Sequence, residues 1–158
     1  MTAGQLTDKG AIWFEKITTG LKQYADVRLV MDDKKALAHF KSLKKEYGAE
    51  NAFADFYYFR LDPDAREMVD ELLDEEERSY LELIAPASDE AEEEIIFPLS
   101  DKLLKIIVKL NAEEMLFSTI YFVQPDPDGR ARTSWWGNYE NEYICFRDRQ
   151  DVHTGSAV

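Results

Sequence analysis

The chain has 158 residues, of which 45% are hydrophobic and 13% aromatic, and it carries a formal net charge of −13. A chain of this length can remove roughly 68–70% of its unfolded surface from water around one core, and the aromatic content excludes a disordered acidic protein. The negative charge excludes direct binding to a nucleic-acid backbone, which requires Lys and Arg side chains to displace counterions.

Cysteine content and hydropathy indicate a cytoplasmic location. Cys145 is the only cysteine, which excludes an intramolecular disulfide and a zinc site built mainly on thiolates. No apolar run approaches the ~20 residues of a membrane span, and the first residues lack the features of a signal peptide. We expect one domain over residues 1–148, a flexible tail over residues 149–158 and no membrane partner. The oligomeric state is not predicted.

The first third of the chain predicts a helix, a strand and a second helix. Thr7 is the expected N-cap of the first helix, whose apolar residues form one stripe. That stripe is Trp13, Ile17, Leu21 and Tyr24. Residues 27–31 are partly β-branched and alternate in polarity, which predicts a strand. The second helix follows an Asp32 or Asp33 cap and ends before Gly48. Its inner stripe is Ala36, Leu37, Phe40, Leu43 and Tyr47.

The middle third combines an aromatic run with an acidic one. Residues 53–61 are almost wholly aromatic, which predicts a strand. Asp62 and Pro63 then mark the start of a helix that is expected to continue to about Glu77. Its buried face is Met68, Val69, Leu72 and Leu73. Residues 80–85 predict a short strand, and residues 86–94, which lack large apolar side chains, predict an exposed and mobile loop.

The last third predicts one more helix and then a run of strands. Ser100 caps a helix that buries one broad apolar face. Residues 115–123, 130–136 and 142–146 predict three strands, and the turns between them predict an antiparallel meander. The whole pattern predicts an α+β fold, with a mixed but mainly antiparallel sheet and about four helices packed mostly on one face. Residues 115–123 are apolar on both sides, so the second face is expected to be partly covered.

The negative charge is concentrated between Asp62 and Glu94. These 33 residues contain 15 Asp or Glu and only two basic residues, Arg66 and Arg78, so they hold a charge equal to that of the whole chain. Solubility explains such a segment, as does neutralisation by the lysine-rich face of the second helix. The functional explanation is a docking surface for a basic partner. Its candidate partner-binding residues are Asp64, Glu67, Asp70, Glu71, Asp74, Glu75, Glu76 and Glu77.

A second candidate site lies in the predicted C-terminal meander. Trp135 and Trp136 are adjacent in one strand and must point to opposite faces of the sheet, so one of them lies outside the main core. That tryptophan either packs beneath a helix or loop or lines an aromatic pocket for a ligand. The residues of this candidate ligand pocket are Arg132, Ser134, Trp135, Trp136, Asn138, Tyr139 and Tyr143.

Common catalytic and cofactor motifs are missing from the sequence. His39 and His153 are far apart in sequence and predict no metal site, and the glycines form no nucleotide-binding loop. The turn at residues 126–129 lacks the glutamate of a calcium loop, and a strand position predicts that Cys145 is buried and unreactive. Acidic runs such as residues 75–77 are typical of solvated faces. We therefore predict no catalytic residue, no cofactor and no metal.

Three functional hypotheses follow from these patterns. The first is a non-catalytic interaction module whose acidic segment binds a basic protein, of which an immunity-like or inhibitor-like protein would be one instance. The second is a small-molecule or peptide binding module with its pocket at the aromatic meander. The third is a hydrolase with a carboxylate pair, which requires two acids facing one cleft. The missing motifs favour a protein that is not an enzyme.

Overall fold

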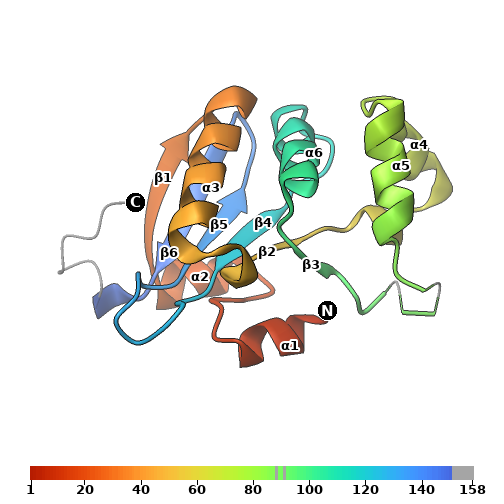
Figure 1. Cartoon of the computed structure of the whole chain (residues 1–158). Helices are drawn as coiled ribbons and strands as arrows, with labels where there is room; N and C mark the ends of the chain where they lie inside the picture. The colour runs from red at the N-terminus through yellow and green to blue at the C-terminus, as the bar shows by residue number, and fades with distance from the viewer. Residues whose placement is uncertain (88, 91, 151–158) are drawn as a thin grey trace.

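The computed structural model describes residues 1–87, 89–90 and 92–150, and its centre is one six-stranded sheet. The strands are β1 (Ala25–Val30), β2 (Ala52–Asp55), β3 (Ile96–Pro98), β4 (Thr119–Phe122), β5 (Thr133–Gly137) and β6 (Glu142–Arg147). They lie in the order β1-β6-β5-β4-β2-β3, and each of these pairings is antiparallel (Figure 1). The predicted α+β class and C-terminal meander are confirmed, but these strands form an antiparallel sheet rather than a mixed one.

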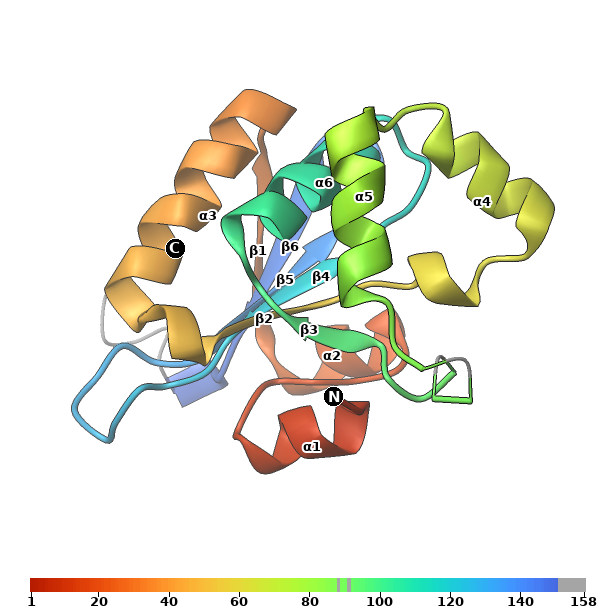
Figure 2. The same ribbon diagram turned by 45° about the vertical axis from the view of Figure 1, so that its right-hand side comes forward.

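Two long helices cover one face of the sheet (Figures 1 and 2). They are α3 (Asp33–Tyr47) and α6 (Asp101–Ala112). Alternate strand residues such as Trp135 and Cys145 point into this layer, and the Trp135 ring lies edge-on to Phe40 of α3 with centroids 5.5 Å apart. Burial of such large side chains is the main favourable contribution to folding. Burial also raises the pKa of the Cys145 thiol to about 12, so it stays protonated at neutral pH.

The predicted starts of both helices and the predicted end of α3 are confirmed. Asp32 and Ser100 are the N-caps, and the side chain of each accepts a hydrogen bond from the backbone N–H three residues further on. Gly48 follows α3 with a φ of 95°. Both helices therefore start at a side-chain cap, and α3 ends at a glycine.

The N-terminal segment covers part of the opposite face of the sheet. Its helices are α1 (Ala3–Asp8) and α2 (Ile17–Gln23). Between them the chain is extended, and Ile12 and Phe14 pack against Ile144 and Phe146, the alternate residues of β6. The expectation that the second face is partly covered is confirmed.

The single first helix predicted from Thr7 is wrong. Gly10 adopts a φ of 94°, a value that suits glycine and ends helical geometry there. The cap of α1 is Thr2, whose hydroxyl accepts a hydrogen bond from the Gln5 N–H, while the Gln5 side chain accepts one from the Thr2 N–H. The predicted apolar stripe is thus divided, and Trp13 belongs to the extended stretch that crosses the sheet.

The acidic segment forms two helices beside α6, with α4 on the outer side of α5 (Figures 1 and 2). They are α4 (Pro63–Asp70) and α5 (Glu75–Ile84). The predicted continuation of one helix to Glu77 is wrong because Asp74 caps a new helix in a reciprocal pair of hydrogen bonds with Glu77. The predicted strand at residues 80–85 is also wrong, since α5 continues through residue 84 and buries Leu81. Residues 86, 87, 89, 90 and 92–94 belong to no helix or strand.

Two strands are shorter than the apolar runs that predicted them. β2 ends at Asp55, and Tyr58–Arg60 forms a 3-10 turn. β4 begins at Thr119 rather than at residue 115, because Asn111 in the last turn of α6 accepts a hydrogen bond from the Ser118 N–H at 3.1 Å. This bond holds the connection from α6 against the sheet.

The predicted flexible tail lies mostly outside the described residues, since only residues 149 and 150 of it are described. Arg149 donates a hydrogen bond to the carbonyl of Lys22, at the end of α2. No helix in the described part of the chain has the length and apolar character needed to cross a membrane.

Candidate functional site

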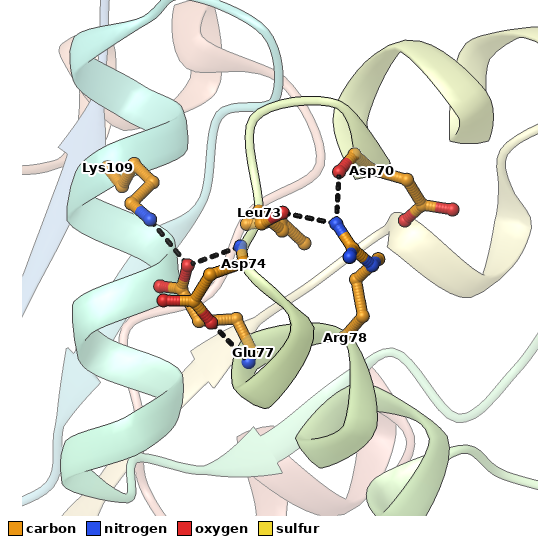
Figure 3. Close-up of polar contacts among 6 residues, drawn as sticks. All are labelled: Asp70, Leu73, Asp74, Glu77, Arg78 and Lys109. Atoms are coloured by element: carbon orange, nitrogen blue, oxygen red, sulfur yellow. Dashed lines mark hydrogen bonds and ion pairs between the residues drawn. The ribbon is translucent and has the colours of Figure 1, made fainter.

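The predicted docking residues lie on α4, α5 and the turn between them, but three of them have partners within the fold (Figure 3). Glu77 is 6% exposed, and its Oε1 lies 2.5 Å from Lys109 Nζ of α6. The Asp74 carboxylate caps α5, and the Asp70 carboxylate accepts a hydrogen bond from the Tyr58 hydroxyl at 2.6 Å. These three carboxylates stabilise the α4–α5 pair and are not free for docking.

The two arginines of the acidic segment direct hydrogen bonds to backbone carbonyls. Arg66 donates to the Phe59 carbonyl at 3.0 Å. Arg78 donates to the carbonyls of Asp70, at 3.1 Å, and Leu73, which lie where α4 ends (Figure 3). Carbonyls at a helix end lack partners inside the helix, so these contacts satisfy them.

Six of the eight predicted docking residues are exposed, and five of these have carboxylates that do not cap a helix. These five are Asp64, Glu67, Glu71, Glu75 and Glu76. No ion pair involves them within the described residues. Among the lysines of α3, Lys44 forms an ion pair with Asp101 of α6 at 3.0 Å. The lysine that pairs with the acidic segment is Lys109 of α6, which contacts Glu77.

The predicted aromatic pocket residues divide between the two faces of the sheet. Trp135 and Tyr143 are buried in the layer beneath α3. Trp136 points to the other face, where its ring stacks on Phe14 with centroids 5.6 Å apart. This division follows from the alternation of side chains along a strand.

The other predicted pocket residues divide as well. The buried Ser134 hydroxyl donates to the Ile12 carbonyl at 2.6 Å, and Arg132 forms two hydrogen bonds of 2.8 Å with the Asp148 carboxylate. Both contacts tie together parts of the fold. Asn138 and Tyr139 lie beyond the end of β5 and share a pocket with Trp136.

That pocket has a volume of about 280 Å³ and lies where the N-terminal segment crosses the sheet. Its aromatic lining is Trp13, Phe14, Tyr57, Phe117, Trp136 and Tyr139. Its polar lining is Glu15, Asp55, Ser118, Thr119 and Asn138. At ~30 Å³ per water molecule the pocket has the volume of about nine waters, which suits a ligand with a single ring.

Asp55 is the buried carboxyl group of this pocket and is 6% exposed. Its Oδ1 accepts a hydrogen bond from the Thr119 N–H at 2.7 Å, and its Oδ2 accepts one from the Tyr121 hydroxyl at 3.0 Å. Burial raises the pKa of Asp55 to about 7, because the charged form loses its hydration, and the two hydrogen bonds only partly oppose this. This carboxyl group therefore changes protonation state near neutral pH.

Strand register brings the pocket residues together. Ala54 of β2 pairs with Ile120 of β4, so Asp55 lies beside Thr119, and Thr119 pairs in turn with Trp136 of β5. The polar and aromatic groups thus come from three neighbouring strands. A shift of one residue in any of these pairings would send them to the other face.

The aromatic walls of the pocket are packed on both sides. The Phe14 ring meets the Phe146 ring edge-on, with centroids 4.8 Å apart. A Cβ atom at Gly20 would lie 2.3 Å from the Phe14 ring, so α2 can approach this ring only with glycine there. On the opposite wall, Phe117 and Tyr139 pack edge-on with centroids 4.8 Å apart.

Ser118 adds an unsatisfied polar group to the pocket lining. The residue is 3% exposed, and its Oγ has no hydrogen-bond partner within the described residues. Buried hydroxyl groups in native proteins nearly always have a partner. The Oγ atom is itself buried, so it does not reach a molecule in the pocket as the side chain stands.

Sequence reasoning missed most of this pocket, although one signal was present. Asp55 is the only acid in the otherwise apolar and aromatic run of residues 52–59, where an acid within a predicted strand calls for an explanation. Trp13 and Glu15 gave no such signal, because their position over the sheet depends on the chain turning at Gly10.

No protein-family model, curated protein or solved structure matches this chain. Within the part of the chain that the structure describes, no three or more His, Cys, Asp or Glu side chains are grouped to hold a metal ion. A proposal for the function of this protein therefore rests on the geometry of the aromatic pocket and of the acidic helices.

Replacing Asp55 by Asn should change the pH dependence of stability. The pKa of Asp55 is higher in the folded protein than in the unfolded chain, where it is 3.8. The protonated carboxyl group therefore makes its full contribution to stability below pH 3.8, and this contribution is lost as the pH rises to about 7. The amide cannot ionise and keeps an acceptor for the Thr119 N–H. The free energy of unfolding of Asp55→Asn relative to wild type should rise by about 2 kcal/mol between about pH 5.5 and about pH 8.5.

Urea denaturation at a series of pH values measures this difference. Asp26→Asn, at an exposed acid on β1, is the matched control and should show a flat difference. A flat difference for Asp55→Asn as well would contradict a buried carboxyl with a raised pKa.

Proposed function

We propose that this protein is a small-molecule binding module whose ligand occupies the pocket between the N-terminal segment and the sheet. The observation that carries the proposal is the buried Asp55 carboxyl in a pocket of about 280 Å³ with aromatic walls. Apolar walls with a few placed polar groups, one of them with a shifted pKa, are the usual form of a ligand site. The volume is near the lower end of the ~300–1,000 Å³ typical of such sites.

Preorganisation of the pocket also supports the proposal. Phe14 is held between the rings of Trp136 and Phe146 and against Gly20, so this wall does not need to become ordered when a ligand enters. Binding to a preformed wall avoids part of the entropic cost of association. Asp55 supplies the polar contact that would orient the ligand.

A screen of single-ring compounds should find ligands that occupy this pocket. Neutral, cationic and anionic compounds would be tested at up to millimolar concentration by ligand-observed NMR and by tryptophan fluorescence, to which Trp13 and Trp136 contribute from the pocket lining. Asn138→Phe should fill the space beside Trp136 and weaken binding by about tenfold or more.

Asp128→Phe is the matched control because it places the same side chain on the exposed loop between β4 and β5. It should bind like wild type. Failure of every compound to bind, or equal binding by Asn138→Phe, would contradict the proposal.

The pocket also contains two residues on which the hypothesis of a hydrolase with a carboxylate pair could rest. Asp55 and Glu15 both line it, which meets the requirement for two acids facing one cleft. Chemical conversion of a bound compound during the screen would identify a hydrolase, whereas recovery of the unchanged compound supports a binding module.

Docking of a basic protein on the acidic helices is the second candidate function. The observation that favours it is the separation of roles within the segment. The carboxylates of Asp70, Asp74 and Glu77 and both arginines have partners in the fold, whereas the other five predicted docking carboxylates are exposed and form no ion pair in the described structure. An acidic surface of this kind attracts basic partners.

Reversing exposed charges on this surface should abolish capture of a basic partner. The test variant is Glu71→Lys, Glu75→Lys and Glu76→Lys, which leaves Glu77 and its ion pair intact. Asp8→Lys, Asp26→Lys and Glu113→Lys is the matched control, with the same change in net charge at exposed positions elsewhere. Capture from a lysate should be lost in the test variant, be kept in the control and weaken at high salt. Equal capture by both variants would contradict docking on these helices.

A further inference from the structure

We propose that the aromatic pocket selects a small organic monocation, a protonated amine on a single ring or short carbon chain, with its ammonium group on Asp55 and its carbon skeleton against the Phe14–Trp136 stack. This inference rests on the proposed function, because it names the class of ligand for the same pocket. The evidence for it is the combination of acidic and aromatic groups that line the pocket, because this combination suits a cation better than a neutral or anionic molecule.

The charged groups of the pocket lining are all acidic. Asp55 and Glu15 are its ionisable acids, and among the described residues no Lys, Arg or His lines it. An anion would thus meet two carboxyl groups and no compensating cation, which disfavours it. A cation finds an opposite charge in a site where burial strengthens the attraction.

The aromatic walls favour the same ligand class. The faces of Trp, Tyr and Phe rings attract cations within about 6 Å, with tryptophan the strongest. Two of the three tryptophans of the chain, Trp13 and Trp136, line this pocket. Sites that combine aromatic walls with a carboxylate are the common solution for binding ammonium groups.

An ionised Asp55 has acceptor capacity left, because a carboxylate offers about four lone-pair sites and two of them are used by Thr119 and Tyr121. The Thr119 N–H can only donate, so Oδ1 must remain an acceptor, and a proton carried by Asp55 resides on Oδ2. The Tyr121 hydroxyl can either donate to that oxygen or accept from it. When an ammonium group arrives, the neutral carboxyl group loses its proton to solvent, and the carboxylate then accepts a hydrogen bond from the ammonium N–H.

Proton release makes the affinity for a cation depend on pH. The titratable groups around Asp55 are Tyr121 and Tyr57, with Glu15 and Arg60 near Tyr57. Burial raises the pKa of Tyr57 to about 12 and that of Tyr121 well above its ordinary value, so both stay neutral between pH 6 and pH 8. Asp55 is then the group that links cation binding to protons in this range, and affinity for a cation should increase as the pH rises.

Benzylammonium and benzyl alcohol test the inference, because they share the ring and differ in charge. Isothermal titration calorimetry at about pH 8 should give an affinity for benzylammonium about tenfold or more above that for benzyl alcohol. The affinity for benzylammonium should fall by about tenfold or more on lowering the pH to about 5.5, while that for benzyl alcohol stays constant. Titrations in buffers of different ionisation enthalpy should show a proton released with the cation alone.

Two variants separate the role of Asp55 from that of the pocket. Asp55→Asn should remove the preference for benzylammonium and its pH dependence but keep the binding of benzyl alcohol. Glu15→Gln, at the exposed acid of the lining, should keep the pH dependence. Because the pH series and the comparison of the two compounds use the wild-type protein, they remain decisive even if a variant does not fold.

Each outcome has a definite meaning. Equal binding of the two compounds, or tighter binding of benzyl alcohol, would overturn the inference while leaving the proposed binding function intact. Binding of neither compound would overturn the choice of a cation, and the failure of the wider screen as well would overturn the binding function. A preference for benzylammonium that survives in Asp55→Asn would show that the cation is bound by other groups and would overturn the assigned role of Asp55.

Discussion

A carboxyl group held in the interior by the Thr119 N–H and the Tyr121 hydroxyl is the constraint on which the pocket depends. Removing a charged carboxylate from water is costly, and two hydrogen bonds recover only part of that cost. Asp55 therefore remains near the balance between its two protonation states at neutral pH. Leucine or valine would fill the same strand position without this cost. An acid at this position is therefore consistent with a task that an apolar residue cannot perform.

The two acidic features of the molecule differ in physical character. On α4 and α5 some carboxylates have partners in the fold: Glu77 takes part in the capping box of α5 and pairs with Lys109. Others, such as that of Glu75, are exposed to solvent. Exposed carboxylates of this kind act through long-range attraction, which salt screens. Asp55 acts at short range from a buried position, where charge has a larger effect. The acidic helices would thus govern the approach of a macromolecule, and the pocket would select a small one.

Sequence patterns predicted the parts of the fold that local signals control. The α3 and α6 caps, the C-terminal meander and the opposite orientations of Trp135 and Trp136 all depend on neighbouring residues. The break at Gly10 and the new cap at Asp74 also have local signals, a glycine with positive φ and an Asp-x-x-Glu capping box. The pocket could not be predicted, because it requires the register of β2, β4 and β5 and the crossing of the N-terminal segment. Of the predicted pocket residues, only Trp136, Asn138 and Tyr139 line it, since strand alternation carries Trp135 and Tyr143 to the other face.

In the binding scheme proposed above, Asp55 is a buried carboxyl group whose proton is exchanged for a bound cation. Carbon-detected NMR of the Asp55 side-chain carboxyl, followed through a pH titration, measures this directly. We expect a midpoint near pH 7 in the free protein, because burial raises the pKa of Asp55 to about 7. We also expect a midpoint lower by at least about one pH unit when the pocket is saturated with benzylammonium. A free-protein midpoint near the ordinary value of 3.8, or a midpoint that does not move when benzylammonium is bound, would contradict this binding scheme.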